Sequence, residues 1–294
     1  MRRFIIGTDW WTDCDDAVAM RILAKAHKNK EIFIEGVIIN ACMEYSVTSL
    51  DGFLQLEGCE NIPIGIDLKA TDFGGNPPYQ KRLSSYAKNR KSNSDAKNGV
   101  RLYREILSTA NCPVEMIEIG YLQCFVELLE SGPDDISNKT GLELIEEKVS
   151  KLWVMAGKWD ADGEKENNFC RNMRSRIAGK IFCEKCPVPV TFLGFEVGVD
   201  VITGDTLSHD DFLWQALNDH GSPNGRSSWD PMLVALALVG DENIAGYDCI
   251  KGIASVDEKT GQNYFKHSKA GKHSYVVKKH SNCFYQSAIN KIIT

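Results

Sequence analysis

A short apolar run followed by a cluster of acidic residues, at the N-terminus, is the feature that most constrains the fold of this chain. Residues 4–8 are mostly apolar and predict a buried strand. Apolar side chains recur with helical spacing from Ala17 onward, which predicts a helix from about Asp16 to His27. Between these two elements lie four closely spaced carboxylates, those of Asp9, Asp13, Asp15 and Asp16. The predicted order is therefore strand, acidic turn and helix.

The acidic turn has two explanations. Neighbouring carboxylates repel one another unless a positive charge offsets the repulsion. Calcium and magnesium prefer carboxylate and carbonyl oxygens, and calcium accepts about six to eight of them in loose geometry. Alternatively, Asp13, Asp15 and Asp16 cap the helix and oppose its positive N-terminal dipole end. Because a cap needs only one or two acids, we favour a divalent cation.

Strands and helices continue to alternate along the chain. Further strands are predicted over residues 33–40, 62–66, 113–120, 151–157 and 188–196. Nearly continuous apolar strands are typical of parallel strands that are covered on both faces. The predicted fold class is therefore α/β, with an open, mostly parallel, Rossmann-like sheet and helices on both faces. Beyond Gly240, short β segments and a final helix predict a small C-terminal β/α extension of one domain that spans residues 1–294.

One segment interrupts this alternation. Residues 69–98 are polar and rich in glycine, and we expect a long loop that is either a functional lid or mobile. Tyr79 lies in this segment and is best explained as an exposed loop tyrosine.

Composition limits the class of partner. The 294 residues are 43% hydrophobic and 25% charged, which is ordinary for a globular protein with a full core. The net charge of −6 argues against a general nucleic-acid surface, so we expect a small-molecule partner and no nucleic acid. No apolar run approaches the ~20 residues that cross a bilayer, and the N-terminus does not resemble a signal peptide. We therefore expect no membrane contact and a cytoplasmic location.

The ten cysteines are expected to be reduced thiols. Cys183 and Cys186 form a Cys-x-x-Cys pair, which supplies two ligands where a structural zinc site needs four. Since no second pair completes it, we interpret this spacing as incidental.

The strand and its acidic loop, which ends in Asp-Asp-Ala at the start of a helix, resemble the N-terminal signature of the inosine-uridine preferring nucleoside hydrolase family. The usual form of that signature is Asp-x-Asp-x-x-x-Asp-Asp. Asp9, Asp15 and Asp16 match it, although the spacing here is two residues longer. Gly7 stands where the family normally has its first Asp, and Asp13 is an additional acid.

Later stretches extend the resemblance in the same order. Residues 120–124 fall where the family has Gly-Pro-Leu-Thr-Asn, and a main-chain carbonyl that matches Gln123 ligates calcium there. Glu166 and Asn168 match a Glu-x-Asn step that holds the ribose hydroxyls, a pairing that suits a vicinal diol. The alternative is that both residues cap a helix that starts near Phe169.

The last match is Asp230. Followed by Pro231 at the head of an apolar helix, it is typical of an N-cap. In the family the remaining metal carboxylate lies at the same place, usually after a His. Here Trp229 precedes it, so the group that assists the departing base is missing.

The resemblance implies calcium-dependent hydrolysis of the N-glycosidic bond of a nucleoside, which gives ribose and a free base. It implies that Ca²⁺ is held by Asp9, Asp16, Asp230 and the carbonyl of Gln123, and that Asp9 also takes a proton from the metal-bound water. Asp15, Glu166 and Asn168 would bind the sugar. Trp229 could stack on a purine, while His209 or Tyr79 could donate a proton to the base. Relatives are usually homodimers or homotetramers.

Two other functions are compatible with these motifs. One is a catalytically silent relative that binds a nucleoside or ribose without cutting it. The other is a magnesium-dependent phosphohydrolase of the haloacid dehalogenase type, which also begins with aspartates at a strand end. That class needs Asp-x-Asp directly after the first strand, and Asp9-Trp10-Trp11 does not supply it.

Overall fold

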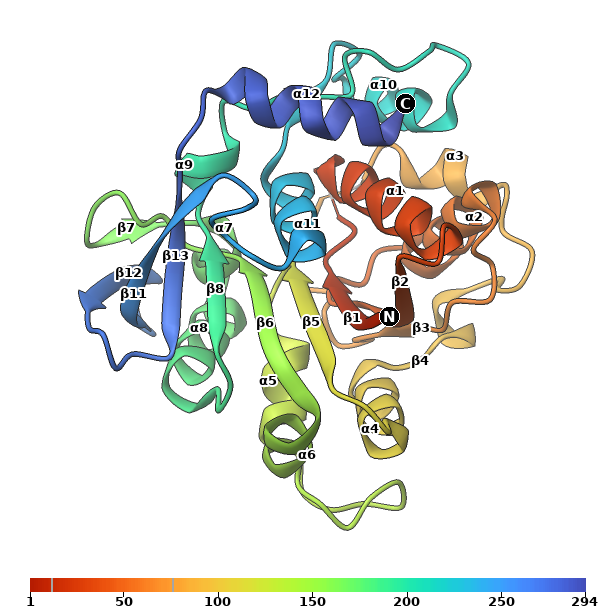
Figure 1. The fold of residues 1–294 in the computed structure, drawn as a ribbon. Coiled ribbons are helices and arrows are strands. Elements are labelled where there is room, and N and C mark those ends of the chain that lie inside the picture. The colour runs from red at the N-terminus through yellow and green to blue at the C-terminus, as the bar shows by residue number, and fades with distance from the viewer. Residues whose placement is uncertain (12, 76) are drawn as a thin grey trace.

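One large sheet organises the molecule (Figure 1). A computed structural model describes residues 1–11, 13–75 and 77–294. Within these residues eleven strands form the sheet, and β9 (Ile202–Thr203) and β10 (Arg226–Ser227) form a small separate one. Along the large sheet the strands are β4 (Lys97–Asn98), β3 (Ile64–Ile66), β2 (Ile32–Ile39), β1 (Arg2–Thr8), β5 (Val114–Ile119), β6 (Val149–Met155), β8 (Val190–Leu193), β13 (His273–Lys278), β11 (Tyr247–Val256), β12 (Gln262–His267) and β7 (Glu164–Lys165).

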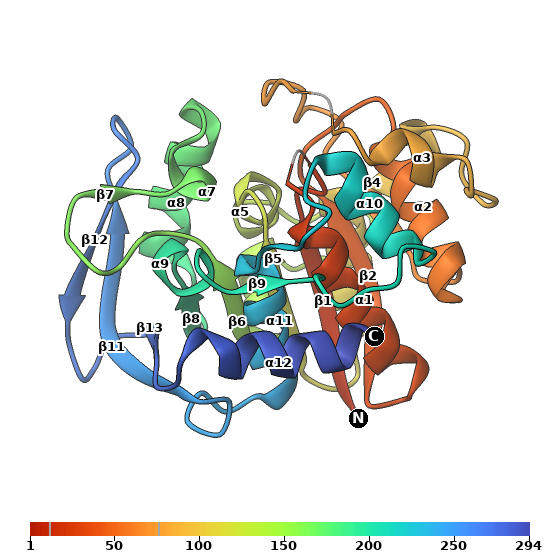
Figure 2. The ribbon, with the colours of Figure 1, turned by 90° about the horizontal axis from the view of Figure 1, so that it is seen from above.

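The eight strands from β4 to β13 run parallel to their neighbours, and β13, β11, β12 and β7 pair antiparallel to one another. The antiparallel strands β11, β12 and β13 form the predicted C-terminal extension, which ends in α12 (Asn282–Ile293). Because β13 pairs with β8, this extension continues the main sheet. Figure 2 shows α12 running back across the molecule from β13 toward α1.

Helices cover both faces of the sheet. The helices are α1 (Asp15–Lys28), α2 (Ser46–Glu57), α3 (Gln80–Ser84), α4 (Gly99–Thr109), α5 (Gln123–Leu129), α6 (Gly141–Lys148), α7 (Asn167–Cys170), α8 (Met173–Lys185), α9 (Phe195–Gly198), α10 (Phe212–His220), α11 (Trp229–Val239) and α12. Phe4 and Ile6 of β1 pack with α1, α2, α11 and α12, whereas Ile5 packs with α4, α5, α6 and α8. Since alternate strand residues face opposite sides of a sheet, two cores result. The predicted fold class is confirmed.

The strand order reverses at β1, which pairs with β2 on one side and β5 on the other. In open α/β sheets ligands bind outside the carboxyl ends of the strands at such a switch point. β1, β2, β5 and β6 all run parallel, so the residues that follow their last positions meet at one edge. The acidic turn after β1 lies at this edge.

The prediction of a long loop over residues 69–98 was wrong in part, because this segment contains α3, a 3₁₀ turn (Asn93–Asp95) and β4. α3 packs so closely on α2 that a Cβ atom on Gly52 would lie 1.9 Å from the Leu83 carbonyl oxygen. Tyr79 is fully buried against Trp10, so the interpretation of it as an exposed tyrosine was also wrong. The few apolar residues of this segment contact helices that are distant in the sequence, and such contacts leave no periodic pattern in the sequence.

Among the helices in the described part of the chain, none is long and apolar enough to span a membrane.

Candidate active site

The turn after β1 folds the acidic residues back over the start of α1. The Thr8 hydroxyl donates a hydrogen bond to the Asp16 carboxylate. The Trp10 amide donates to the Thr8 hydroxyl (3.0 Å) and to Asp16 Oδ1 (3.3 Å). Trp10 has a φ of 45°, a left-handed conformation that non-glycine residues adopt only when their surroundings hold them there. Its buried indole, which donates to the Ser49 hydroxyl at 2.8 Å, provides that hold.

Trp10 and Trp11 lie within the acidic turn and have different surroundings. The Trp10 ring packs into the core, with Tyr79 at 5.7 Å between ring centroids. Trp11 instead lines the cavity beside the acidic turn, and its indole donates to the Gly74 carbonyl (2.7 Å). Trp10 therefore anchors the turn in the core, and Trp11 supplies part of the cavity wall.

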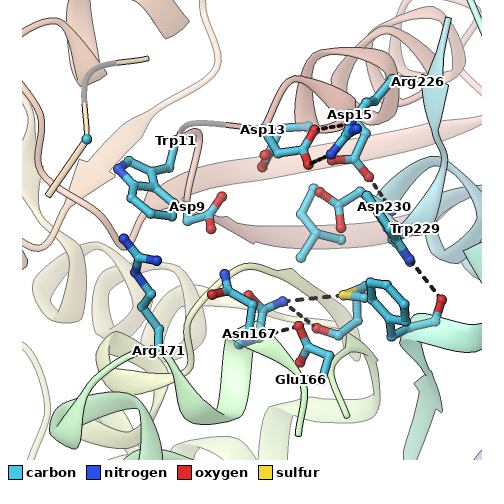
Figure 3. Close-up of a pocket in the computed structure, with 16 residues that line it drawn as sticks. Asp9, Trp11, Asp13, Asp15, Glu166, Asn167, Arg171, Arg226, Trp229 and Asp230 are labelled. Carbon is cyan, nitrogen blue, oxygen red and sulfur yellow. Dashed lines mark hydrogen bonds and ion pairs between the residues drawn. The ribbon is translucent and has the colours of Figure 1, made fainter. Parts of the chain in front are cut away.

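This cavity has a volume of about 490 Å³ and opens at the carboxyl edge of the sheet (Figure 3). Its lining includes carboxylates, aromatic rings and arginines. The carboxylates are those of Asp9, Asp13, Asp15, Asp16, Glu166 and Asp230; the rings are those of Trp11, Phe195 and Trp229; the arginines are Arg171 and Arg226. Among the described residues, those that line it do not include Gln123.

Three of the carboxylates form a compact group. Oxygen atoms of Asp15, Asp16 and Asp230 all lie within 4.8 Å of one another, and all three side chains are buried. The first two come from the start of α1, and the third from the start of α11. The Asp230 amide donates to Asp15 Oδ2 (3.1 Å), which ties the two helix ends together. Asp230 is the second residue of α11 and Ser228 takes the N-cap position, so the prediction that Asp230 is the N-cap was wrong.

Burial dominates the electrostatics of these acids. It raises the pKa of Asp230, Asp15 and Asp16 well above the usual value, and the neighbouring carboxylates raise it further. Burial likewise raises the pKa of Asp9 to about 7, against the effect of a hydrogen bond shared with Asp16. Each acid resists ionisation because it is buried and because other carboxylates lie close to it.

The group fits a divalent cation. Carboxylates that are buried together need a positive charge to remain ionised. The nearby guanidinium of Arg226 is engaged elsewhere, since its Nε and Nη2 atoms donate to both oxygens of Asp13 (2.9 and 2.6 Å). A hard cation with oxygen ligands is the partner that this donor set suits. The ion pair also defines the place of Asp13, the additional acid: it holds Arg226 at the cavity wall.

Glu166 and Asn168 line the opposite wall, and both are buried. Glu166 caps α7, because its carboxylate accepts hydrogen bonds from the Asn168 amide (2.8 Å) and the Gly157 amide (2.9 Å). The Asn168 side chain donates to the Met155 carbonyl (2.8 Å). Burial raises the pKa of Glu166 to about 7. Glu166 therefore both caps α7 and lines the cavity. Asn168 is the second residue of α7, so the alternative that both residues cap a helix was wrong for Asn168.

Trp229 lies at the cavity rim and stacks on Phe195, with 5.3 Å between ring centroids and 27° between the rings. Its indole donates to the Phe195 carbonyl (2.9 Å), which fixes the ring. The two rings together form an apolar part of the cavity lining.

Gln123 is the first residue of α5, and its buried side chain donates to the Asn40 carbonyl. Asn40 follows β2 at the same edge and is a residue that sequence reasoning missed. Its Oδ1 atom accepts from the Tyr121 amide (2.9 Å), while its buried Nδ2 atom has no partner among the described residues. Asn40 is the last residue of a predicted strand, and a polar residue at that end was the available signal.

Neither suggested proton donor reaches the cavity lining within the described residues. His209 stacks on Trp214, with ring centroids 4.2 Å apart. Tyr79 is buried on the far side of Trp10, and burial raises the pKa of its hydroxyl well above the usual value. Arg171, which no motif suggested, does line the cavity.

No family model and no curated protein matches this sequence. Solved structures do match its fold. A plant nucleoside hydrolase is similar with a TM-score of 0.74 at 15% identity, covering 100% of this chain and 99% of that one. The inosine-uridine preferring nucleoside hydrolase from Bacillus anthracis is similar with a TM-score of 0.71 at 15% identity, covering 100% and 99%.

The type III effector protein XopQ, solved in complex with adenosine diphosphate ribose, is similar with a TM-score of 0.69 at 13% identity, covering 99% of this chain and 93% of that one. The match extends over nearly the whole length of each structure. The chain therefore has the fold of the nucleoside hydrolases, as the resemblance of its motifs implied.

Proposed function

We propose that this protein is an N-glycosyl hydrolase that uses calcium to hydrolyse a nucleoside to ribose and a free base. The observation that carries the proposal is the buried group of Asp15, Asp16 and Asp230. It faces Glu166 and Asn168 across a cavity at the carboxyl edge of a nucleoside hydrolase fold. Similar structures that are named as nucleoside hydrolases support the reaction class.

Asp16 and Asp230 would hold the ion, because both match the family motif and both belong to the buried group. The motif adds Asp9 and the main-chain carbonyl of Gln123. Asp15 would bind a ribose hydroxyl, although its carboxylate is part of the same group. Calcium bound there would make water more acidic.

Side chains of the protein would carry out the remaining steps of the reaction. Asp9 would take the proton from the attacking water as a general base. Glu166 and Asn168 would hold sugar hydroxyls. As the C1′–N bond breaks, positive charge builds up on the sugar, and the surrounding carboxylates would stabilise it. Trp229 and Phe195 would stack on the base.

Binding without hydrolysis is the second candidate. Trp229 stands where relatives carry a His, and one similar structure is an effector protein with bound adenosine diphosphate ribose. In that case the cavity would retain its ligand unchanged.

We further propose that the chain acts in the cytoplasm as one domain over residues 1–294, assembled as a homodimer or homotetramer. The usual assembly of the relatives supports this proposal. Light scattering on the purified protein tests the assembly, and the mass of a single chain in solution would contradict it.

The deciding experiment measures base and ribose release from purine and pyrimidine nucleosides. The protein is first treated with a chelator and then given calcium or magnesium. Hydrolysis that calcium restores supports the proposal. Tight binding of a nucleoside with no turnover supports the second candidate, and release of phosphate from phosphate esters would indicate a phosphohydrolase instead.

A further inference from the structure

We propose that Arg171 binds a phosphate group on C5′ of the sugar, so that the substrates of this site are nucleoside 5′-monophosphates. This inference rests on the function proposed above and narrows its substrate class.

Two arginines line the cavity. Arg226 has its charge matched by Asp13, which accepts two hydrogen bonds from it. Arg171 has no carboxylate partner among the described residues, although several carboxylates line the same cavity. A positive charge at the cavity wall is therefore left for a ligand.

Two contacts fix the orientation of the Arg171 side chain. Its Nη2 atom donates to the Phe73 carbonyl (2.8 Å), and its guanidinium lies 4.5 Å from the centre of the Trp11 ring. Trp11 is itself 6% exposed and bonded to the Gly74 carbonyl, so the surface beneath the guanidinium is fixed. These contacts orient the group and leave most of its N–H donors without a protein partner among the described residues. A planar, oriented fork of donors suits the oxygens of a phosphate.

Arg171 lies close in the chain to the proposed sugar-binding residues. Arg171 directly follows α7, whose first turn carries the proposed sugar-binding residues Glu166 and Asn168. In Figure 3 Arg171 and Trp11 lie at one end of the cavity and Trp229 at the other, with the carboxylates between them. The base and the C5′ group leave a ribose from the two carbons that flank its ring oxygen. A base that stacks on Trp229 therefore directs C5′ toward Arg171.

The reaction leaves the phosphate untouched. The C1′–N bond breaks, a C1′–O bond forms with water, and the departing nitrogen keeps the bonding electrons and takes up a proton. The products are ribose 5-phosphate and the free base, and no oxidant or further reactant is needed.

The test compares inosine and uridine with their 5′-monophosphates on calcium-loaded protein, with chromatography of the free base as the readout. Because a hydrogen bond to a charged group contributes strongly, we expect kcat/KM to favour each monophosphate by about tenfold or more. Arg171→Gln should lower this preference by about tenfold, and Arg171→Lys should lower it less, since a lysine keeps the charge without the fork. Arg101→Gln removes an arginine charge from the exposed surface of α4 and should leave the preference unchanged.

An equal preference in the wild type and Arg171→Gln, or a wild type that favours nucleosides, would overturn the inference. If neither substrate is cut, the proposed hydrolysis itself fails, and calorimetry then decides the role of Arg171. Ribose 5-phosphate that binds more tightly than ribose, with the difference lost in Arg171→Gln, supports a phosphate site. Equal binding of the two sugars rules it out.

Discussion

Asp9 lies where negative charge is densest at the carboxyl edge. Its carboxyl group is buried and shares a hydrogen bond with Asp16, while the charges of Asp15, Asp13 and Glu166 oppose its ionisation. A base in this position takes up a proton readily, because protonation relieves repulsion. The same burial and repulsion mean that Asp9 destabilises the folded protein when no metal is bound. Its presence there therefore points to a functional rather than a structural role.

Asp9→Asn should therefore lower kcat by about a hundredfold to ten-thousandfold, as loss of a general base does. It should also raise the melting temperature of the chelator-treated protein, since one member of a repelling group is removed. Steady-state kinetics and calorimetry measure the two effects. A folded Asp9→Asn protein with near wild-type kcat would show that another group takes the proton.

Asp15 and Asp16 are adjacent, yet we assign them different partners. Calcium should raise the melting temperature of the wild type, because a ligand that binds the folded state stabilises it. Asp16→Asn should abolish most of this shift. Asp15→Asn should preserve it but raise KM about tenfold, through loss of a charged hydrogen bond to the sugar. If Asp15→Asn also abolishes the shift, Asp15 is a metal ligand.

At the scale of elements, β5 places a carboxylic acid beneath the acidic turn. Glu118 is fully buried, and its Oε1 atom accepts a hydrogen bond from Tyr103 of α4 (2.8 Å). Gly7 of β1 makes room for it, because a Cβ atom there would lie 1.8 Å from Glu118 Oε2. Burial raises the pKa of Glu118 to about 8. The missing first Asp of the signature is thus a glycine that a neighbouring strand requires.

This acid makes stability depend on pH in a defined direction. Its pKa is higher in the folded state than the ordinary value of 4.5, so the folded state binds more protons between these two values. The stabilisation is complete below pH 4.5 and is lost as the pH rises to about 8. Glu118→Gln, which stays neutral, should therefore flatten the fall in the free energy of unfolding across this range. Urea titrations at several pH values test this, with Glu146→Gln at an exposed position of α6 as the control. Parallel curves for wild type and Glu118→Gln would contradict it.

The sequence predicted those parts of the site whose residues lie close together along the chain. Asp9, Asp15 and Asp16 are encoded in one strand-turn-helix, and all three line the cavity as expected from that pattern. Arg171, which lines the cavity, was missed because only the folded chain brings it to the acidic turn. Tyr79 and the helix after it were misjudged because their burial depends on α2 and Trp10.

At the scale of the whole molecule, the site depends on distant parts of the chain meeting at α1. Asp15 and Asp230 are 215 positions apart, and packing of α1 against α11 brings them together. On another side of α1, the buried side chain of Arg21 forms ion pairs or hydrogen bonds with residues in, or at the start of, three further helices. Its guanidinium pairs with Glu57 of α2, with Asp211 at the start of α10 (2.8 Å) and with the Ile293 carbonyl of α12 (3.1 Å).

Arg21 should therefore hold the helices around α1 in their positions against it. Arg21→Gln leaves Glu57 buried without its partner, and we expect it to lower the free energy of unfolding by about 3–5 kcal/mol. The double variant Arg21→Met/Glu57→Met should recover much of this loss, because an apolar pair of similar volume needs no compensating charge. Lys25→Gln, one turn further along α1, removes a surface bond to the Ile292 carbonyl and should cost less than about 1 kcal/mol.

Urea denaturation gives the free energies, and hydrogen exchange of the α12 amides shows whether that helix loosens first. We expect faster exchange in α12 for Arg21→Gln than for Lys25→Gln, since Arg21 bonds the last turn of α12 from within the core. Equal effects of the two variants would mean that apolar packing of Tyr285, Ile289 and Ile293 holds α12 without the ion pair. In that case the calcium-dependent melting shift should be the same in both, because α1 would keep its place against α11.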